Sequence, residues 1–220
     1  MQCRQAGMKL CPGECNDIVI VAQGGSLMLD MLQYRDLDSL YAANLECRAC
    51  GLRQGCRQVV ISRGNPSARV MLVGEGPGAQ EDAQGQVFVG PAGQLLDKIL
   101  AAAELPPEDV YITNVVKCRP PGNRLPKADE TKCCLPWLER QIELVSPKLI
   151  ICLGALAGQT LISPDLRITR DRGRWSAYRD IDITATFHPA ALLRDPKLKR
   201  PMWEDFKVVR DYYKRSVREE

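Results

Sequence analysis

The sequence predicts an α/β protein in which a buried sheet is layered with helices. Four short apolar segments, rich in β-branched residues, have the character of buried parallel strands: residues 69–73, 110–113, 149–153 and 181–187. Helical patterns lie between them, and this alternation is typical of layered α/β folds. The chain has 220 residues, of which 45% are hydrophobic and 26% charged, so it is long enough for one domain with a well-buried core.

The predicted helices carry apolar residues at helical spacing, as helices that pack on a sheet do. In the first of them, Leu96 and Leu100 are four residues apart and therefore share a face. In the last, Phe206, Val209 and Tyr213 do the same. The four main helical segments are residues 92–105, 127–145, 154–162 and 202–217.

The first 30 residues do not fit this alternation. We expect residues 1–30 to form a mobile extension and residues 31–220 to form a single domain. Three cysteines lie in the extension, at Cys3, Cys11 and Cys15, and a second metal site there is an open alternative. The short apolar piece at residues 18–22 lacks the length of a signal-peptide core. No run approaches the roughly 18 to 20 apolar residues that span a bilayer, so we expect a cytoplasmic protein.

Charge is distributed unevenly along the chain. The formal net charge is +3, yet residues 167–220 carry 14 Lys or Arg against 9 Asp or Glu. A basic C-terminal third suits a polyanionic partner. A solvated surface of mixed charge is the alternative interpretation.

Glycine-rich or polar motifs follow the predicted strands at the points where they end. Val73 runs into "GEGPG", Thr113 into "NVVKCRPPGNR", and Phe187 into His188 and Pro189. In open α/β sheets, ligands bind beyond the carboxyl ends of the strands. These motifs therefore predict one shared pocket.

Clustered cysteines indicate a metal centre. The chain has ten cysteines, and Cys47 and Cys50 form a C-x2-C motif. Cys118 and Cys134 are the best candidates to complete the site, with Cys133 as the alternative to its neighbour, because adjacent helical residues point about 100° apart. Four thiolates allow zinc or an iron–sulfur cluster. Two further cysteines are interpreted as core or surface residues, namely Cys56 and Cys152.

The motifs "VGEGPGAQEDAQGQVFVGPAGQLLDKIL", "YITNVVKCRPPGNRLP" and "TFHPAALLR", with the cysteine set, resemble family 4 uracil-DNA glycosylases, the iron–sulfur enzymes of bacteria and archaea. The resemblance runs from about residue 40 to about residue 215. It implies a three-layer α/β/α sandwich with a central, mostly parallel four-stranded sheet. It also implies removal of uracil from DNA and a structural [4Fe-4S] cluster held by Cys47, Cys50, Cys118 and Cys134.

The resemblance implies a set of uracil-binding residues that suits the chemistry. The target nucleotide must be flipped out of the stack, and the departing uracil anion must be stabilised. His188 is expected to donate to uracil O2, with backbone N–H groups around Gly76 as further donors. Asn114 is expected to pair with the uracil edge, donating to O4 and accepting from N3–H. Phe88 is expected to stack on the base, with a core aromatic as the alternative.

The group that handles the attacking water is left open between Glu75 and Glu81. No other base is obvious beside the single histidine of the chain. Glu81, which precedes Asp82, could instead belong to a helix N-terminal charge pair.

A DNA-contacting surface is predicted after His188. Leu192 and Leu193 could wedge into the base stack, although a helix start that packs its leucines inward is an equal alternative for either one. Basic residues that follow them would hold phosphates: Arg194, Lys197, Lys199 and Arg200. Arg170 and Arg172, in the segment "RITRDRGRW" that also resembles the family, are expected to lie near the DNA or the cluster.

Three other functions compete with this hypothesis. A covalent or tight uracil-DNA binder would carry a basic insertion with an extra histidine, which this chain lacks. An electron carrier would leave Asn114, Phe88 and His188 unexplained. A zinc-bound nucleic-acid module without catalysis would contain no iron.

We expect a monomer that acts on single- or double-stranded uracil-containing DNA and has no membrane partner. The sequence does not specify contacts with a sliding clamp or other repair proteins.

Overall fold

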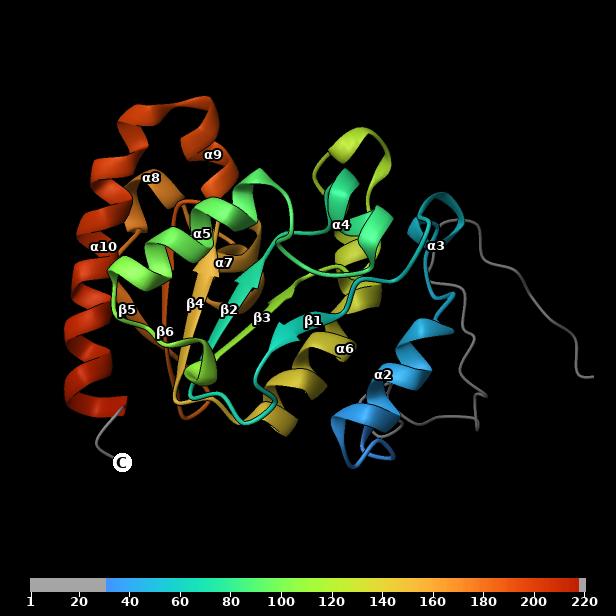
Figure 1. Cartoon of the computed structure of the whole chain (residues 1–220). Coiled ribbons are helices and arrows are strands. Elements are labelled where there is room, and N and C mark those ends of the chain that lie inside the picture. Colours follow the sequence, from blue (N-terminus) through green and yellow to red (C-terminus); the bar gives the residue numbers. More distant parts are fainter. Residues whose placement is uncertain (1–30, 218–220) are drawn as a thin grey trace, which may run out of the picture.

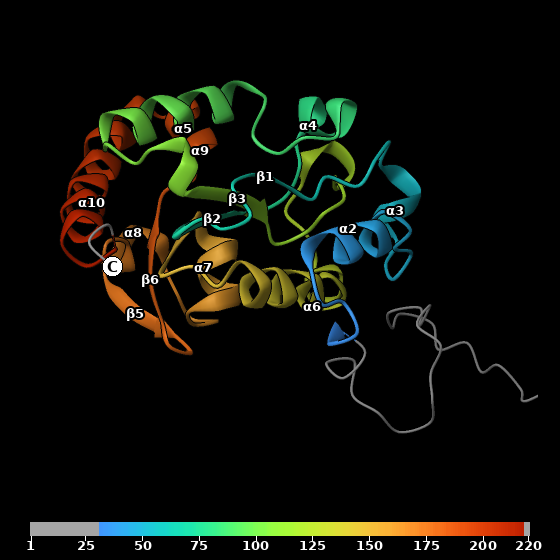
Figure 2. The ribbon, with the colours of Figure 1, turned by 60° about the horizontal axis from the view of Figure 1, so that its bottom comes forward.

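The computed structural model describes residues 31–217, and the predicted extension over residues 1–30 lies outside the described residues. The described chain is a central sheet covered by helices on both faces, as Figures 1 and 2 show. None of its helices is long and apolar enough to cross a membrane, as far as residues 31–217 are concerned.

Four parallel strands form the middle of the sheet, in the order β3-β2-β4-β6. Each lies within a residue of its predicted range, and the four strands are β2 (Val70–Gly74), β3 (Val110–Asn114), β4 (Leu149–Leu153) and β6 (Ile181–Thr186). Every residue of β2, β3 and β4 is buried, which explains why these strands read as continuous apolar runs. The predicted central parallel sheet is confirmed.

Two antiparallel strands complete a six-stranded sheet, and the sequence analysis had missed both. Strand β1 (Ser62–Gly64) pairs with β3, and β5 (Trp175–Tyr178) pairs with β6. Both are short edge strands whose residues are mostly part-exposed or exposed. Because a strand at a half-solvated edge does not require a run of apolar residues, neither β1 nor β5 shows the sequence pattern of a buried strand.

Alternate residues of the strands supply two separate cores. Val70 and Leu72 of β2 face a layer that contains α5 (Pro91–Ala102) and α10 (Lys199–Tyr212), where Phe206 is fully buried. Met71 and Val73 face the opposite layer, which contains α6 (Ala128–Val145) and α7 (Ala155–Leu161). This two-residue alternation produces the three-layer α/β/α arrangement visible in Figure 2.

The helices agree with the four predicted segments and add several short ones. The predicted segments correspond to α5 (Pro91–Ala102), α6 (Ala128–Val145), α7 (Ala155–Leu161) and α10 (Lys199–Tyr212), the last followed by a π-helical turn at Tyr213–Val217. The additional helices are α2 (Leu37–Leu45), α3 (Leu52–Gly55), α4 (Ala79–Gln84), α8 (Ile168–Asp171) and α9 (Pro189–Arg194). Single 3-10 turns lie at Pro107–Asp109, Pro121–Asn123 and Pro196–Leu198.

Candidate active site

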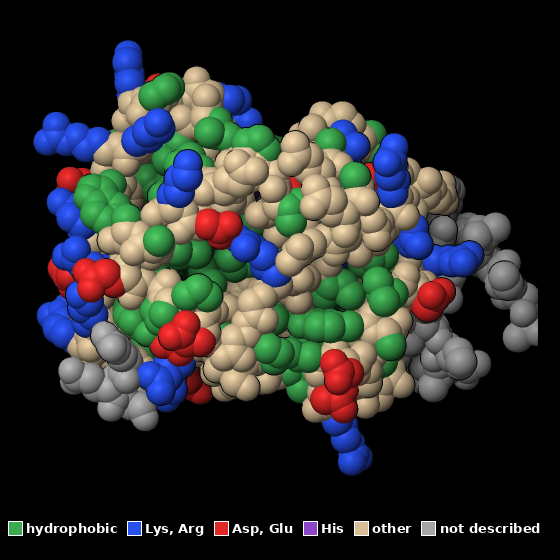
Figure 3. All heavy atoms as spheres, in the orientation of Figure 1, with side chains coloured by type: hydrophobic (Ala, Val, Ile, Leu, Met, Phe, Trp, Pro, Cys, Tyr) green, Lys and Arg blue, Asp and Glu red, His purple; other side chains and the backbone are tan. Residues whose placement is uncertain are grey.

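A cavity of about 440 Å³ lies beyond the carboxyl ends of the four parallel strands. Its walls come from the segment after β2, the end of β3, the start of α7 and the start of α9. In Figure 3 the surface is hollowed between the part that carries α4 and the part that carries α5 and α9. The predicted shared pocket is therefore present, and it gathers Glu75, Gly76, Glu81, Phe88, Asn114, His188 and Arg194.

Asn114 is the last residue of β3 and lies at the base of this cavity with 1% of its surface exposed. Its Oδ1 atom is buried and has no hydrogen-bond partner among the described residues. Gly74 is its register partner on β2, and a side chain at Gly74 would collide with this amide. A buried acceptor without a partner costs free energy, so it marks a place where a ligand N–H can bind.

Phe88 forms one wall of the cavity with 5% of its surface exposed. Its φ angle of 52° is unusual for a bulky residue, and its ring is stacked near His188 with centroids 5.6 Å apart and planes inclined by 26°. Gly93 packs against the Phe88 backbone so closely that a Cβ atom there would overlap the carbonyl group of Phe88. The absence of side chains at Gly74 and Gly93 leaves the space that Phe88 needs in this position.

His188 precedes α9 and acts as its N-terminal cap. Its Nδ1 atom accepts a hydrogen bond from the backbone N–H of Ala190 at 3.1 Å. Burial, together with the positive charge of Arg194, lowers the pKa of His188 to about 4. The imidazole is therefore neutral near pH 7, and its proton must sit on Nε2, because Nδ1 is occupied as an acceptor.

Glu75 lies on the cavity wall, and burial raises the pKa of its carboxyl group against the opposing effect of Arg194. Its Oε1 atom accepts one long hydrogen bond, of 3.5 Å, from the backbone N–H of Leu156. Gly154, with a φ angle of +98°, leaves the space that this carboxylate occupies, since a Cβ atom there would lie 2.5 Å from Oε1.

Glu81 is held differently, because both of its carboxylate oxygens accept backbone hydrogen bonds. Oε2 accepts from the N–H of Gly78 at 3.1 Å, and Oε1 accepts from the N–H of Gly90 at 2.9 Å. The carboxylate thus caps α4 and ties two glycine-containing loops together at the edge of the cavity.

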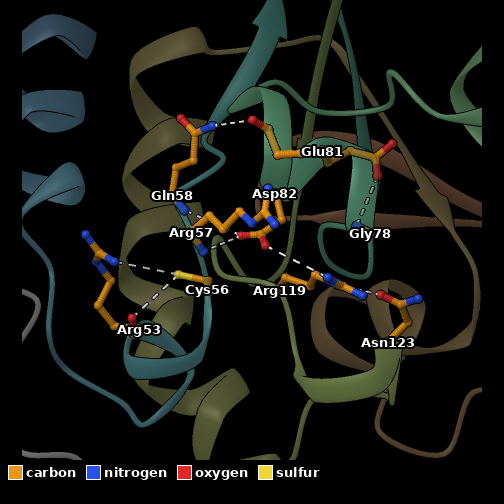
Figure 4. A network of polar contacts seen from close by, with 10 residues as sticks. Arg53, Cys56, Arg57, Gln58, Gly78, Glu81, Asp82, Arg119 and Asn123 are labelled. Carbon is orange, nitrogen blue, oxygen red and sulfur yellow. Dashed lines mark hydrogen bonds and ion pairs between the residues drawn. The ribbon is translucent and has the colours of Figure 1, made fainter.

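A polar network connects α4 to the segment that follows the C-x2-C motif, as Figure 4 shows. Asp82 accepts a hydrogen bond from the backbone N–H of Arg57 at 2.8 Å and lies 3.9 Å from the guanidinium of Arg119. Arg119 in turn donates to Asn123 at 2.7 Å. The network links the wall of the cavity to the loops that carry the cysteines.

The four cysteines predicted as ligands lie around one small cavity, together with Cys133 and Lys117. All four are free thiols. Burial raises the pKa of Cys50 and Cys118, and raises that of Cys134 to about 12. Within residues 31–217, no group of three or more His, Cys, Asp or Glu side chains converges closely enough to hold a single metal ion.

The predicted DNA-contacting residues divide into exposed and engaged side chains. Leu193 is 49% exposed, whereas Leu192 is 2% exposed and packs into the core beneath α9. Arg172 donates to the carbonyl of Pro201 at 2.6 Å and to Asp205 at 2.5 Å. The remaining basic residues are exposed, namely Arg170, Arg194, Lys197, Lys199 and Arg200. Of these, Arg170 is also engaged, because it forms an ion pair with Asp171 at 2.7 Å. In Figure 3, Lys and Arg side chains project from the part of the surface that carries α9 and α10.

Sequence reasoning missed two residues of this region. Gly154 shapes the Glu75 side of the cavity, and its signal was its position directly after a predicted strand. Lys117 is 1% exposed and bonds to the backbone of Asn114. Its signal was its place between two predicted site residues, Asn114 and Cys118.

A family model described as the uracil DNA glycosylase superfamily matches residues 61–207. The match contains all four parallel strands and the whole run of cavity residues from Glu75 to Arg194. The fold is therefore that of this superfamily.

Individual relatives define the family more closely. The chain is 41% identical over 183 residues to a type-4 uracil-DNA glycosylase of Archaeoglobus fulgidus, covering 79% of this chain and 91% of that protein. It is 40% identical over 177 residues to a type-4 uracil-DNA glycosylase of Thermotoga maritima, covering 78% and 91%. A type-5 uracil-DNA glycosylase of Pyrobaculum aerophilum is 33% identical over 146 residues, covering 59% and 64%. The chain belongs to the type-4 uracil-DNA glycosylases.

Proposed function

We propose that this protein removes uracil from DNA by hydrolysing its N-glycosidic bond and leaves an abasic site for repair. The observation that carries the proposal is the pairing of Asn114 and His188 in one cavity. Asn114 offers a buried acceptor without a partner, and His188 offers a neutral Nε2–H donor. An acceptor and a donor that line one cavity match the polar groups of a uracil ring.

Base recognition follows from the amide of Asn114. Its Oδ1 atom would accept from uracil N3–H, and its Nδ2 atom would donate to O4. Cytosine presents an acceptor at N3 and a donor at N4, so it would oppose both contacts. A site built around such buried polar atoms rejects the wrong partner strongly, because its own groups would remain unpaired.

Bond cleavage leaves negative charge on the departing uracil, and the cavity supplies neutral donors for that charge. His188 would donate from Nε2 to uracil O2, which stabilises the leaving group without a proton transfer. Gly76 lines the same cavity, and backbone N–H groups near it would be further donors. Phe88 would stack on the flipped base, since its ring borders the cavity next to the imidazole.

Glu75 is the stronger candidate to position the attacking water. Its carboxylate has a raised pKa from burial and one long hydrogen bond, so it retains capacity to accept from a water molecule. Glu81 has committed both oxygens to the backbone of Gly78 and Gly90. We therefore assign Glu81 to holding the loops that shape the pocket, and Glu75 to the water.

The cysteine cavity fits a [4Fe-4S] cluster held by Cys47, Cys50, Cys118 and Cys134. In such a cluster each thiolate binds a different iron, so the ligands must surround a cavity and need not converge on one point. When bound, the cluster supplies thiolate cross-links that order the loops around it. Because burial raises the pKa of the Cys50, Cys118 and Cys134 thiols, cluster binding by these three residues would release protons.

The exposed surface of α9 and the turn after it would bind the DNA. Leu193 is the leucine available to enter the base stack, since Leu192 is already buried in the core. Arg194, Lys197 and Lys199 follow it in the chain, are exposed, and would contact phosphates. Arg172 is engaged with Pro201 and Asp205, so we assign it to holding α10 beside the pocket. Either single- or double-stranded DNA can meet this surface, and one monomer is sufficient. Because its substrate is DNA, we place the protein in the cytoplasm, which is the compartment that holds the DNA in bacteria and archaea.

The Asn114→Ala variant tests the proposal, with Asn65→Ala as the matched control far from the cavity. Loss of the amide should lower the rate of uracil release by about 10²–10³-fold while the visible absorbance stays unchanged. Full activity of Asn114→Ala would show that the base is read elsewhere. Binding without any release of uracil by the wild-type protein would favour a non-catalytic uracil-DNA binder instead.

A further inference from the structure

A lysine is buried between the uracil-recognition residue and the cysteine cavity. Lys117 lies three residues after Asn114, directly before Cys118, and has 1% of its surface exposed. Its Nζ atom donates to the carbonyl oxygen of Asn114 at 2.6 Å and to Oγ1 of Thr113 at 2.7 Å. A buried amine is costly unless it is bonded, so these two oxygens fix where the side chain lies.

The two bonds are the end of a longer buried network. Thr113 Oγ1 lies 3.2 Å from Oε1 of Gln141 on α6, whose Nε2 donates to the hydroxyl of Tyr111 at 2.8 Å. That hydroxyl shares a 2.6 Å hydrogen bond with Tyr41 on α2. The network therefore connects the end of β3, to which Lys117 bonds, with two helices on one face of the sheet.

The other side of Lys117 faces the cysteines. The residue lines the same cavity as the four predicted ligands and directly precedes one of them, Cys118, in the chain. One residue thus borders the cysteine cavity and bonds to Asn114 through its side chain.

We propose that Lys117 is a positioning residue that holds the backbone of Asn114 so that its amide faces the uracil edge, and that it couples this orientation to the cysteine-bearing segment. The proposal rests on the proposed function. It follows from the side chain of Asn114, whose Oδ1 has no partner of its own within the described chain. The direction of that amide therefore depends on its backbone, and Lys117 holds the carbonyl of the same residue.

The Lys117→Met variant removes these two side-chain bonds and keeps the length of the side chain. Main-chain bonds remain on either side of the segment, from Val115 N–H to the Gly74 carbonyl at 2.9 Å and from Val60 N–H to the Lys117 carbonyl at 2.8 Å. We therefore expect the variant to fold and to retain its iron. Lys98→Met, which alters an exposed lysine on α5, is the matched control.

The test compares binding to two DNA duplexes, one with a non-cleavable 2′-fluoro-2′-deoxyuridine and one with a tetrahydrofuran abasic analogue. Lys117→Met should lose about tenfold or more in affinity for the fluorouridine duplex, as expected for loss of well-oriented hydrogen bonds. Its affinity for the abasic duplex, which has no base to recognise, should match that of the control. Equal affinities of variant and control for both duplexes, or equal losses on both, would overturn the proposal.

A second variant keeps the proposal testable if Lys117→Met loses its iron or does not fold. Thr113→Val removes one of the two oxygens that hold the amine, so it should show the same selective loss at smaller magnitude. No selective loss in Thr113→Val would then overturn the proposal. If the proposed function itself were wrong, the wild-type protein would bind the fluorouridine duplex no more tightly than an unmodified duplex. This result distinguishes failure of the proposed function from failure of the Lys117 proposal.

Discussion

Replacing Gly74 by alanine adds a single carbon beside the proposed uracil-recognition residues Asn114 and Phe88. The backbone of Gly74 is an ordinary strand backbone that alanine can adopt, so the effect comes from space alone. The new Cβ atom would overlap Oδ1 of Asn114 and lie 2.8 Å from Cζ of Phe88, where ordinary contacts begin at 3.4 Å. The Phe88 ring must therefore move by about 0.6 Å and the amide by more. Misplacement of about 1 Å in a catalytic site can lower the rate by about 100-fold.

We therefore expect Gly74→Ala to lose about 100-fold in kcat/KM for uracil release, with a stability loss of about 1–3 kcal/mol from overpacking. The assay is release of uracil from an oligonucleotide under single-turnover conditions, alongside urea unfolding. Gly55→Ala is the control, because a Cβ atom there meets nothing within 4 Å. Activity of Gly74→Ala within a fewfold of wild type would refute the reasoning that the Asn114 and Phe88 positions are both required.

Three further predictions address other parts of the site. His188 has its pKa lowered from 6.5 to about 4, so between these values the unfolded chain binds the extra proton and the folded chain does not. As the pH falls from 6.5 to 4, the free energy of unfolding of the wild type should therefore drop by up to about 3 kcal/mol relative to that of His188→Gln, as measured by urea unfolding. A difference between the two proteins that does not change with pH would contradict this prediction. Cys50→Ser should lose more than about half of its iron and visible absorbance. Cys152→Ala, which alters a cysteine in a buried strand, should keep both. Full iron content in Cys50→Ser, measured by iron analysis, would contradict this prediction. Leu193→Ala should reduce excision from double-stranded DNA about tenfold more than from single-stranded DNA, with unfolding within about 0.5 kcal/mol of wild type. Leu192→Ala should instead lose about 2–5 kcal/mol of stability, and an unchanged unfolding midpoint would show that it is not a core residue.

The central strands could be predicted because their residues are buried on both faces. Ile150 and Ile151, for example, face opposite cores and are both fully buried, so the whole segment must be apolar. Ser62 and Trp175 belong to edge strands that are part-exposed, and nothing in their local sequence requires a strand. Their pairing is decided by the neighbouring strand, which a local pattern does not contain.

The site could be predicted where a strand end fixes a residue, and less well where tertiary packing decides its role. Asn114 and His188 meet in one cavity because parallel strands end at one edge of the sheet. Leu192 and Leu193 are adjacent and chemically identical, and only the packing of α9 separates the buried one from the exposed one. Lys117 reads as a surface lysine in sequence, since its partners come from the fold around it.

The most direct test of the account is incubation of the cluster-loaded protein with oligonucleotides that contain one uracil, followed by alkaline cleavage at abasic sites. We predict cleavage at the uracil position in single- and double-stranded DNA, and none at cytosine in the matched oligonucleotide, because the Asn114 amide opposes the cytosine edge. Absence of cleavage at uracil by protein that carries its full iron content would contradict the central claim.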